Sequence, residues 1–167
     1  MGKTAVVVMG VAGCGKTTTA ETMATLLGWP CVDADDFHSD ANVAKMRAGT
    51  PLSDDDRMPW LRSIRDWISA APSDVVLTCS ALRRSYRDVL REAEARVRFV
   101  HLHGSRELLA KRMGARKGHF MPLTLLDSQL ATLEVLQPDE DGTVVSIDAT
   151  PDEIASSALD ALALRTT

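Results

Sequence analysis

The apolar run A-V-V-V-M at residues 5–9 is followed directly by G-V-A-G-C-G-K-T at residues 10–17, and these two segments together indicate the fold. The apolar run predicts a buried strand. The second stretch fits G-x-x-x-x-G-K-[ST], the pattern of a phosphate-binding loop, and a helical pattern follows it directly. Because the loop pattern stands between a predicted strand and a predicted helix, it predicts a site for a nucleoside triphosphate and its magnesium ion.

The residue types of this loop explain how it would hold phosphate. Gly10, Gly13 and Gly15 let the backbone adopt positive φ and come close to a ligand. Successive N–H groups, together with the positive end of the following helix, then bind anionic oxygens. Lys16 places a positive charge on the β- and γ-phosphates, and the hydroxyl of Thr17 can bind Mg²⁺.

The three cysteines, Cys14, Cys31 and Cys79, have no spacing typical of a metal site. We expect reduced thiols of a cytoplasmic protein rather than a disulfide framework. Cys14 lies inside the loop, where we expect a tolerated variable position. Alternatively, the helix N-terminus lowers the pKa of its thiol and makes it oxidisable.

Length and composition indicate one soluble globular domain over residues 1–167. Apolar residues make up 45% of the chain and charged residues 25%, which is usual for such a domain. The net charge of −4 and the pI of about 5.5 give no reason to expect a nucleic acid or an anionic membrane as partner. No apolar stretch is long enough to span a bilayer, and the N-terminus leaves no room for a signal peptide, so we expect a cytoplasmic location.

Short apolar runs alternate with amphipathic helical patterns along the chain. This alternation predicts an α/β fold of the P-loop NTPase type, with a five-stranded parallel sheet and helices on both faces. The predicted strands are residues 4–9, 30–33, 75–78, 97–102 and 143–147. The predicted helices run from the loop to 27, over 39–48, from Pro59 onward, over 83–94, over 105–113 and from 150 onward. Pro59 is expected in the first turn of its helix, where proline is tolerated.

Two carboxylates follow the second predicted strand, in the segment D-A-D at residues 33–35. In an extended segment, residues two apart project to the same side, so Asp33 and Asp35 should face one region. That region lies close to the phosphate-binding loop if this strand neighbours the first. One carboxylate could then hold magnesium while the other orients or deprotonates a hydroxyl nucleophile. Since the strand at 75–78 ends without an acid, Asp33 is the predicted magnesium ligand.

A basic segment, G-A-R-K-G-H-F-M at residues 114–121, separates two predicted helices. We expect a mobile lid over about residues 112–122, with Gly114 and Gly118 permitting closure. Phosphoryl transfer spreads negative charge over the γ-phosphoryl oxygens, and Arg116 on such a lid could stabilise that charge. Taken alone, the same run of charge fits a solvated helix end.

Six stretches carry a resemblance that covers almost the whole chain. They are M-G-V-A-G-C-G-K-T at 9–17, D-A-D-D-F-H at 33–38, N-V-A-K-M-R-A-G-T-P-L-S-D-D-D-R-M-P-W-L at 42–61, C-S-A-L-R-R-S-Y-R-D-V-L-R at 79–91, A-R-K-G-H-F-M-P at 115–122 and S-Q-L-A-T-L-E at 128–134. Together they resemble the gluconate kinase family, small P-loop kinases related to shikimate and nucleoside-monophosphate kinases. The second and fourth stretches are far more specific than the loop itself.

The resemblance implies an ATP-dependent kinase that phosphorylates D-gluconate at its 6-hydroxyl, with Mg²⁺ as cofactor and a homodimer as the common assembly. It implies that Lys16, Asp35 and Arg116 are catalytic, with Asp35 activating the hydroxyl, and that Thr17 and Asp33 serve the metal. The implied nucleotide-binding residues are Gly10, Val11, Ala12, Gly13, Cys14, Gly15, Lys16, Thr17, Thr18, Arg112 and Pro151. The implied acceptor-binding residues are Asp35, His38, Asn42, Lys45, Arg57, Arg83 and His119.

The sequence leaves the acceptor and its carboxylate partner open. A sugar acid needs a cation for its carboxylate, and Arg57, Arg83 and Lys45 are the candidates, arginine being suited to bidentate binding. One alternative is another small-molecule kinase of the same fold, with a shikimate-like or a different sugar-acid acceptor. A non-catalytic nucleotide-binding switch would need a guanine-selecting [NT]-K-x-D segment, which the sequence lacks.

Overall fold

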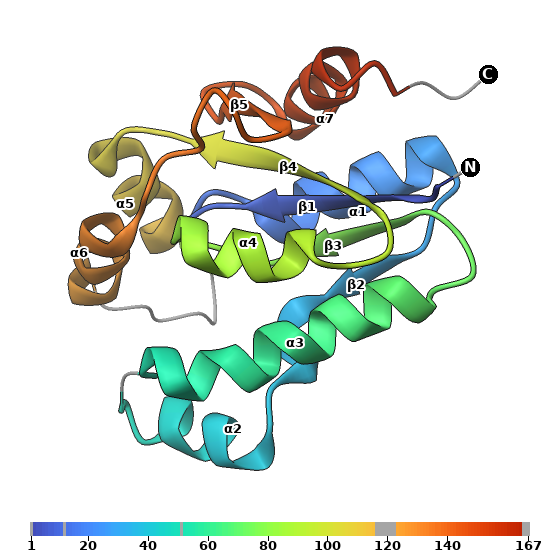
Figure 1. The fold of residues 1–167 in the computed structure, drawn as a ribbon. Coiled ribbons are helices and arrows are strands. Elements are labelled where there is room, and N and C mark those ends of the chain that lie inside the picture. Colours follow the sequence, from blue (N-terminus) through green and yellow to red (C-terminus); the bar gives the residue numbers. More distant parts are fainter. Residues whose placement is uncertain (1, 12, 51, 116–122, 165–167) are drawn as a thin grey trace.

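A parallel sheet forms the centre of the protein (Figure 1). The computed structural model describes residues 2–11, 13–50, 52–115 and 123–164. Within these residues the strand order is β2-β3-β1-β4-β5, and every neighbouring pair is parallel. The strands are β1 (Thr4–Met9), β2 (Cys31–Asp33), β3 (Val75–Thr78), β4 (Arg96–His103) and β5 (Gly142–Ser146). The prediction of a five-stranded parallel α/β fold is confirmed.

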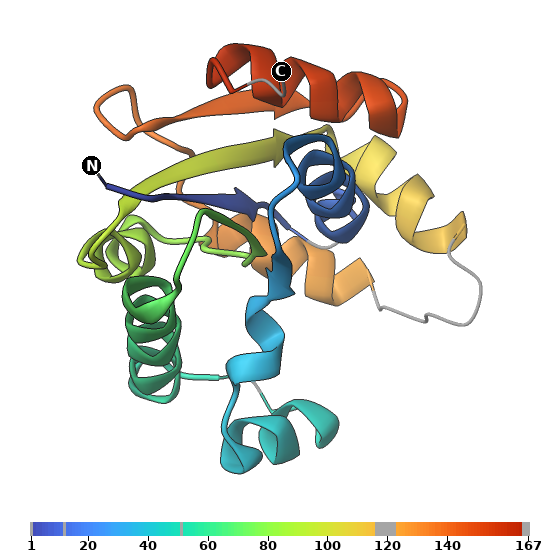
Figure 2. The same cartoon turned by 90° about the vertical axis from the view of Figure 1, so that its right-hand side faces the viewer.

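Helices cover both faces of this sheet (Figure 2). Val6 and Val8 of β1 lie in one core with α1 and α7, whereas Ala5, Val7 and Met9 lie in the other with α3 and α4. Because successive side chains of a strand point to opposite faces, one apolar run supplies both cores. The helices are α1 (Lys16–Leu27), the 3₁₀ helix η1 (Ala34–Phe37), α2 (Asp40–Arg47), α3 (Asp54–Ala70), α4 (Arg84–Arg91), α5 (Arg106–Ala115), α6 (Leu123–Thr132) and α7 (Pro151–Ala161).

The expectation that the D-A-D carboxylates lie near the loop depended on β2 lying beside β1. The structure does not place β2 there. Strand β3 lies between them, and its Thr78 pairs with Asp33 on one side and with Val8 on the other. Helix α1 packs on β3 and so carries the chain past one strand position. The three strands still end at the same edge of the sheet, which keeps Asp33 near the loop after β1.

The prediction that a helix opens at Pro59 was wrong. Helix α3 begins at Asp54, and Pro59 lies inside it. The start is set by a capping box, in which Ser53 accepts from the N–H of Asp56 and the Asp56 side chain accepts from the N–H of Ser53. Three aspartates in the first turn also favour a start here, because negative charge stabilises the positive end of a helix.

Among the described residues, no helix combines the length and the apolar character needed to cross a membrane.

One titratable side chain is buried in the sheet. His101 of β4 is 1% exposed, and its Nδ1 has no hydrogen-bond partner among the described residues. Burial lowers the pKa of His101 to about 4, and the positive charges of His103 and Arg87 act in the same direction. His101 is therefore neutral in the folded protein at neutral pH.

Acid should destabilise the fold through His101. The unfolded chain binds a proton at this residue near pH 6.5, whereas the folded chain binds it only near pH 4. The contribution of neutral His101 to the free energy of unfolding is therefore fully present above about pH 6.5. It is lost as the pH falls toward 4, by roughly 3 kcal/mol in all. Urea unfolding across this range, with wild type and His101→Phe, measures the effect because phenylalanine binds no proton.

His103→Phe is the matched control, since His103 is an exposed neighbour on the same strand. It should keep most of the wild-type dependence of unfolding free energy on pH, because burial is the largest cause of the lowered His101 pKa, while His101→Phe should show a flatter one. Equal pH dependence in wild type and His101→Phe would contradict the assignment.

Candidate active site

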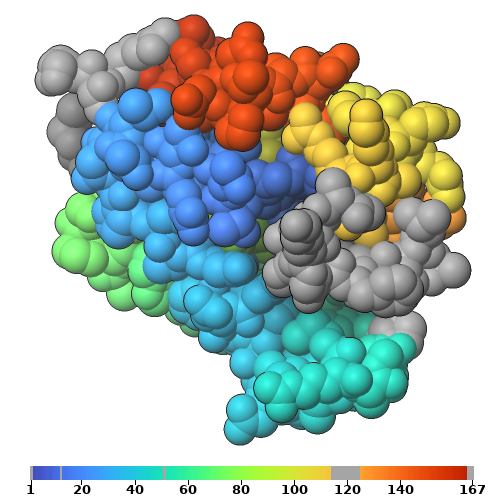
Figure 3. Space-filling model, turned by 180° about the vertical axis from the view of Figure 1, so that it is seen from behind, coloured from blue at the N-terminus to red at the C-terminus, as the bar shows by residue number. Residues whose placement is uncertain are grey.

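A cavity of about 1010 Å³ lies at the carboxyl ends of β1, β2 and β3. Its walls come from the phosphate-binding loop, the start of α1, the turns after β2 and β3, and helices α2 to α6. Figure 3 shows the molecule from behind, with α2 projecting below the body and α5 at one side. The cavity lies where open parallel sheets bind their ligands.

Two glycines let the loop after β1 pack closely against its surroundings. Gly10 has a φ of 149° and Gly13 a φ of 85°, both in the region that L side chains rarely adopt. A Cβ on Gly10 would lie 2.7 Å from Sγ of Cys14 and 2.9 Å from a main-chain oxygen of β4. A Cβ on Gly13 would lie 2.8 Å from Cγ of Met113 in α5. Gly13 and Gly15 line the cavity, so the loop path depends on glycine where a ligand would approach.

Lys16, Thr17 and Thr18 line the cavity at the start of α1. Nζ of Lys16 donates to the main-chain oxygens of Gly10 at 3.1 Å and Val11 at 3.4 Å. The first turn of a helix carries N–H groups without partners inside the helix and the positive end of its dipole. This arrangement favours an anion at the start of α1.

The other predicted residues of the loop do not line the cavity with their side chains, as far as the structure describes them. The side chains of Val11 and Cys14 are buried in the core, and Ala12 lies outside the described residues. Burial raises the pKa of the Cys14 thiol, against the smaller opposing effect of Lys16. The alternative in which the helix start lowers this pKa therefore does not hold, and Cys14 packs as a small apolar residue.

Asp33 and Asp35 both line the cavity, although not as members of one extended segment. Asp33 ends β2, and its Oδ1 accepts a hydrogen bond from the N–H of Asp35 at 2.9 Å. This bond caps η1, so the chain turns into a 3₁₀ helix at Ala34 and Asp35 lies in that turn. The prediction of an extended backbone over residues 33–35 was wrong, yet both carboxylates face the same cavity.

The carboxylate of Asp35 has a raised pKa. Its side chain is 76% exposed and thus open to a ligand. Although a ligand can reach the carboxylate, the surrounding cavity walls reduce its hydration, and this desolvation raises its pKa. The negative charge of Asp33 raises the pKa further, against the opposing effects of His38 and Lys16. A carboxylate with a raised pKa is a better proton acceptor, which suits a general base.

His38 lines the cavity beside Asp35, and Trp60 packs against its ring. Its side chain is 3% exposed, with Nε2 3.7 Å from Oδ1 of Asp35. Its ring stacks on Trp60 of α3, with 4.2 Å between the ring centroids. Nε1 of Trp60 donates to the main-chain oxygen of Ala34 at 2.7 Å. The indole thereby fixes both His38 and the turn that carries Asp35.

Asn42 and Lys45 of α2 are not part of the described cavity wall. Nδ2 of Asn42 lies 3.3 Å from Nδ1 of His38 and donates to the main-chain oxygen of Asp56 at 3.0 Å. Nζ of Lys45 lies 2.8 and 2.9 Å from the two carboxylate oxygens of Asp56. Both residues therefore connect α2 to the start of α3 and do not line the cavity.

Of the two arginines considered for a substrate carboxylate, Arg57 lines the cavity and Arg83 does not. Nη1 of Arg57 donates to the hydroxyl of Tyr86 at 3.1 Å, and that hydroxyl donates to Oδ1 of Asp54 at 2.5 Å. The Arg57 guanidinium also lies 5.5 Å from the centre of the Tyr86 ring. Arg83 is exposed and is the N-cap residue of α4.

The cavity wall includes residues that sequence reasoning did not single out, namely Trp60, Tyr86 and, on α6, Ser128, Gln129 and Thr132. All of them lie within stretches that carry the resemblance. The signal was therefore present, but nothing local distinguishes these side chains from core or surface ones. Only the packing of α3, α4 and α6 around the strand ends reveals their role as a wall.

The residues predicted for the nucleotide base and the lid lie in different parts of the chain. Arg112 of α5 lines the cavity and donates to the main-chain oxygen of Ile147, just after β5. Pro151 is the first residue of α7 and is exposed. Arg116 and His119 lie outside the described residues.

Two oxygen donors in the cavity fit the expected Mg²⁺, the hydroxyl of Thr17 and the carboxylate of Asp33. Within the described ranges, no group of three or more His, Cys, Asp and Glu side chains could hold a metal. Mg²⁺ normally keeps several waters and is bound by one or two protein oxygens together with phosphates. A pair of donors beside a phosphate-binding loop matches that coordination.

Comparisons with known proteins show which family the chain belongs to. A family model described as an AAA domain matches residues 6–136. A gluconokinase of Gluconobacter oxydans (strain 621H) is 51% identical over 151 residues, covering 89% of this chain and 85% of that protein. A solved gluconokinase structure from Sinorhizobium meliloti 1021 has a TM-score of 0.88 at 46% identity, covering 95% of this chain and 91% of that one.

A more distant likeness concerns the fold alone. The structure of shikimate kinase from Aquifex aeolicus vf5 has a TM-score of 0.59 at 16% identity, covering 95% of this chain and 96% of that one.

Gly13→Ala should weaken nucleotide binding. The added methyl would meet α5 at 2.8 Å and would hold an L residue at positive φ, so the loop must shift away from its phosphate-binding path. We expect at least about a tenfold loss of ATP affinity by calorimetric titration, equal to about 1.4 kcal/mol.

Gly28→Ala is the matched control, because Gly28 also has positive φ but has nothing within 4 Å of a Cβ. It should cost stability at the end of α1 and leave ATP affinity at the wild-type value. The loop account fails if both variants bind ATP equally well.

Proposed function

Because the chain belongs to the gluconokinase family, we propose that it transfers the γ-phosphoryl group of ATP to the 6-hydroxyl of D-gluconate, giving 6-phosphogluconate and ADP. The observation that supports this most is that the phosphate-binding loop and Asp35 line one cavity. A kinase must hold donor and acceptor in line, and a shared cavity permits that.

On the donor side, the loop and Lys16 would bind the phosphates of ATP. Thr17 and Asp33 would hold Mg²⁺, which neutralises charge on the β- and γ-phosphates when bound. Arg112 and Pro151 are the proposed contacts to the adenine side, and Arg116 is the proposed lid residue that stabilises charge in transfer.

On the acceptor side, Asp35 is the proposed base. It would accept the proton of the 6-hydroxyl as that oxygen bonds to the γ-phosphorus and the bond to the β–γ bridging oxygen of ATP breaks, with ADP leaving. His38 beside it would keep the carboxylate oriented, at the 3.7 Å separation between Nε2 and Oδ1. The raised pKa of Asp35 supports the role of base.

Arg57 is the proposed partner of the gluconate carboxylate. Its place in the cavity wall supports it over Arg83 and over Lys45, which is paired with Asp56. Tyr86 fixes the guanidinium by a hydrogen bond, so its remaining N–H donors are preorganised for a carboxylate. Asn42, Arg83 and His119 would contribute to the acceptor side less directly.

We further propose a homodimer in the cytoplasm, without nucleic acid or membrane as a partner. The net charge of −4 and the three free cysteines support that setting.

The direct test of the function is ATP-dependent ADP release over a panel of acceptors. Gluconate, other aldonates, shikimate and nucleoside monophosphates are offered to the purified protein with Mg²⁺. We expect release with gluconate, and phosphate on its 6-oxygen by NMR. Release with shikimate alone, or with none of the acceptors, would overturn the proposal.

Asp35→Asn should lower kcat by about 10² to 10⁴ and leave the KM for ATP near the wild-type value, because the amide cannot take up the proton. Asp36→Asn is the matched control, since Asp36 is the adjacent exposed carboxylate and is not part of the described cavity wall. It should keep wild-type turnover. Near-normal kcat in a folded Asp35→Asn protein would remove Asp35 as the base.

A further inference from the structure

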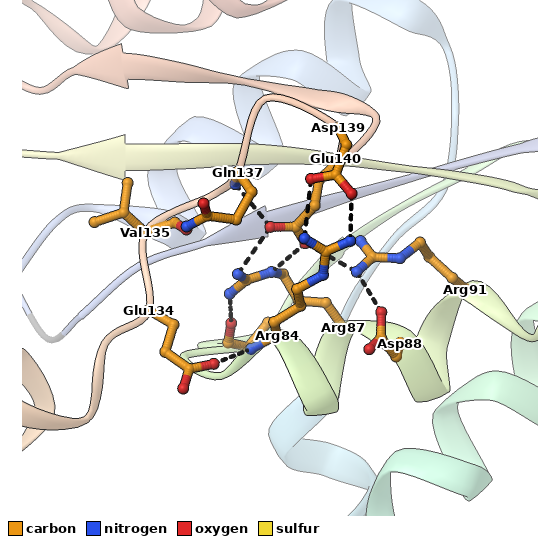
Figure 4. Close-up of polar contacts among 10 residues, drawn as sticks. Arg84, Arg87, Asp88, Arg91, Glu134, Val135, Gln137, Asp139 and Glu140 are labelled. Atoms are coloured by element: carbon orange, nitrogen blue, oxygen red, sulfur yellow. Dashed lines mark hydrogen bonds and ion pairs between the residues drawn. The ribbon is translucent and has the colours of Figure 1, made fainter.

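The stretch S-Q-L-A-T-L-E at residues 128–134 contributes no group to the chemistry proposed above, yet it joins a cavity wall to a connector. Its helical part belongs to α6 and lines the cavity with three polar side chains. Its last residue, Glu134, lies in the connector between α6 and β5, residues 133–141. This connector packs beside α4, whose own residues reach the acceptor side (Figure 4).

The turn after β3, residues 79–83, is held by its main-chain oxygens. The oxygen of Ser80 accepts a hydrogen bond from the first glycine of the phosphate-binding loop at 3.3 Å. The oxygen of Ala81 accepts one from a buried arginine of α4 at 2.8 Å. The oxygen of Leu82 accepts one from the N–H of Glu134 at 2.7 Å. Three consecutive residues are thus fixed by three different parts of the chain.

Helix α4 begins without a cap from its own side chains. Its N-cap residue, Arg83, makes no side-chain cap hydrogen bond. Instead, Oε1 of Glu134 accepts from the main-chain N–H of Arg84 at 2.8 Å (Figure 4). A carboxylate here pairs an N–H that the first turn leaves open and lies at the positive end of the helix dipole. Glu134 therefore holds the chain on both sides of Arg83, by its N–H and by its carboxylate.

A buried ion pair fastens the connector to α4. Arg87 and Glu140 both have side chains that are 0% exposed, with Nε and Oε1 2.7 Å apart and Nη2 and Oε2 3.0 Å apart. Oε2 of Glu140 also accepts from the N–H of Gln137 at 2.8 Å, and Oε1 lies 2.9 Å from Nη2 of Arg91. A buried pair with this many partners tolerates little displacement, so the connector keeps a fixed place against α4.

The first turn of α4 carries Tyr86 into the cavity wall. The N–H of Tyr86 donates to the oxygen of Arg83 at 3.0 Å, so the position of the turn sets the position of the ring. The Tyr86 hydroxyl then accepts from Arg57 and donates to Asp54. A shift of the turn would therefore move the guanidinium of Arg57 within the cavity.

We propose that Glu134 is a positioning residue for the acceptor site: by capping α4 from the connector it sets the place of Tyr86 and, through it, of Arg57. The inference rests on the proposed function, in which Arg57 binds the acceptor carboxylate. The main-chain bond from Glu134 to Leu82 is kept in any side-chain variant, and the Glu134 carboxylate touches neither the phosphate-binding loop nor Lys16 in any contact described above. Removal of the carboxylate should therefore affect the acceptor and not ATP.

The test compares Glu134→Ala with Glu134→Gln in steady-state kinetics. Alanine removes the acceptor of the Arg84 N–H and lets the first turn of α4 shift. We expect the KM for gluconate to rise about tenfold, with the KM for ATP within about twofold. Glutamine keeps a side-chain carbonyl at the same reach, and it should restore the KM for gluconate to within about twofold of wild type.

Asp139→Ala is the matched control. Its carboxylate belongs to the same connector and binds the Arg84 guanidinium at 2.9 and 2.6 Å, but it makes no bond to the main chain of α4. It should leave both KM values unchanged. The proposal is overturned if Glu134→Ala leaves the KM for gluconate unchanged or raises both KM values alike, if glutamine does not restore it, or if Asp139→Ala raises it equally.

Amide hydrogen exchange at the start of α4 gives a readout that needs no substrate. The Arg84 N–H should exchange faster in Glu134→Ala than in wild type or Glu134→Gln, and unchanged exchange would also overturn the proposal. If wild type fails to phosphorylate gluconate, the proposed function falls, while the exchange result still decides whether Glu134 holds α4.

Discussion

Strand β3 pairs in parallel with both β1 and β2, and this pairing brings the functional segments together. Thr78 pairs with Val8 on one side and with Asp33 on the other, so three strands end at one edge of the sheet. Each strand is followed by a segment with chemistry: the phosphate-binding loop, the turn with Asp35, and the turn at residues 79–83. The cavity is the space that these three segments and their helices enclose. Loss of this register would separate the donor groups from the acceptor groups.

Positive and negative groups in the cavity come from different elements of the fold. Positive charge at the donor side comes from Lys16 and the start of α1, while Asp33 and Asp35 lie across from it after β2. Enclosure raises the pKa of Asp35, and the negative charge of Asp33 raises it further, while His38 and Lys16 oppose that rise. Arg57 stands on α3, on the acceptor side, and is held by Tyr86. Cation and carboxylate groups are therefore placed as the proposed acceptor would need them, since gluconate has a hydroxyl at one end and an acid at the other.

Local sequence patterns allowed much of the fold and of the candidate site to be predicted. The features that were missed depend on packing between distant parts of the chain. Strand β1 was predicted with correct bounds, because an apolar run acts over a few residues. The start of α3 was missed because the capping box at Ser53 outweighs a proline five residues into the helix. The place of β2 depends on how α1 packs, which no local pattern records. Tyr86 and α6 entered the site only through tertiary contacts, and the single-domain organisation and the lid remain predictions.

We propose that Asp35 and Arg57 together align the 6-hydroxyl of gluconate with the phosphate donor in one cavity. A crystal structure with gluconate, Mg²⁺ and a non-hydrolysable ATP analogue decides whether they do. We expect the 6-hydroxyl within hydrogen-bond distance of Asp35, about 2.6–3.2 Å, and the gluconate carboxylate paired with Arg57. Gluconate bound in the opposite direction, with its carboxylate toward Asp35, or bound outside this cavity, would show that they do not.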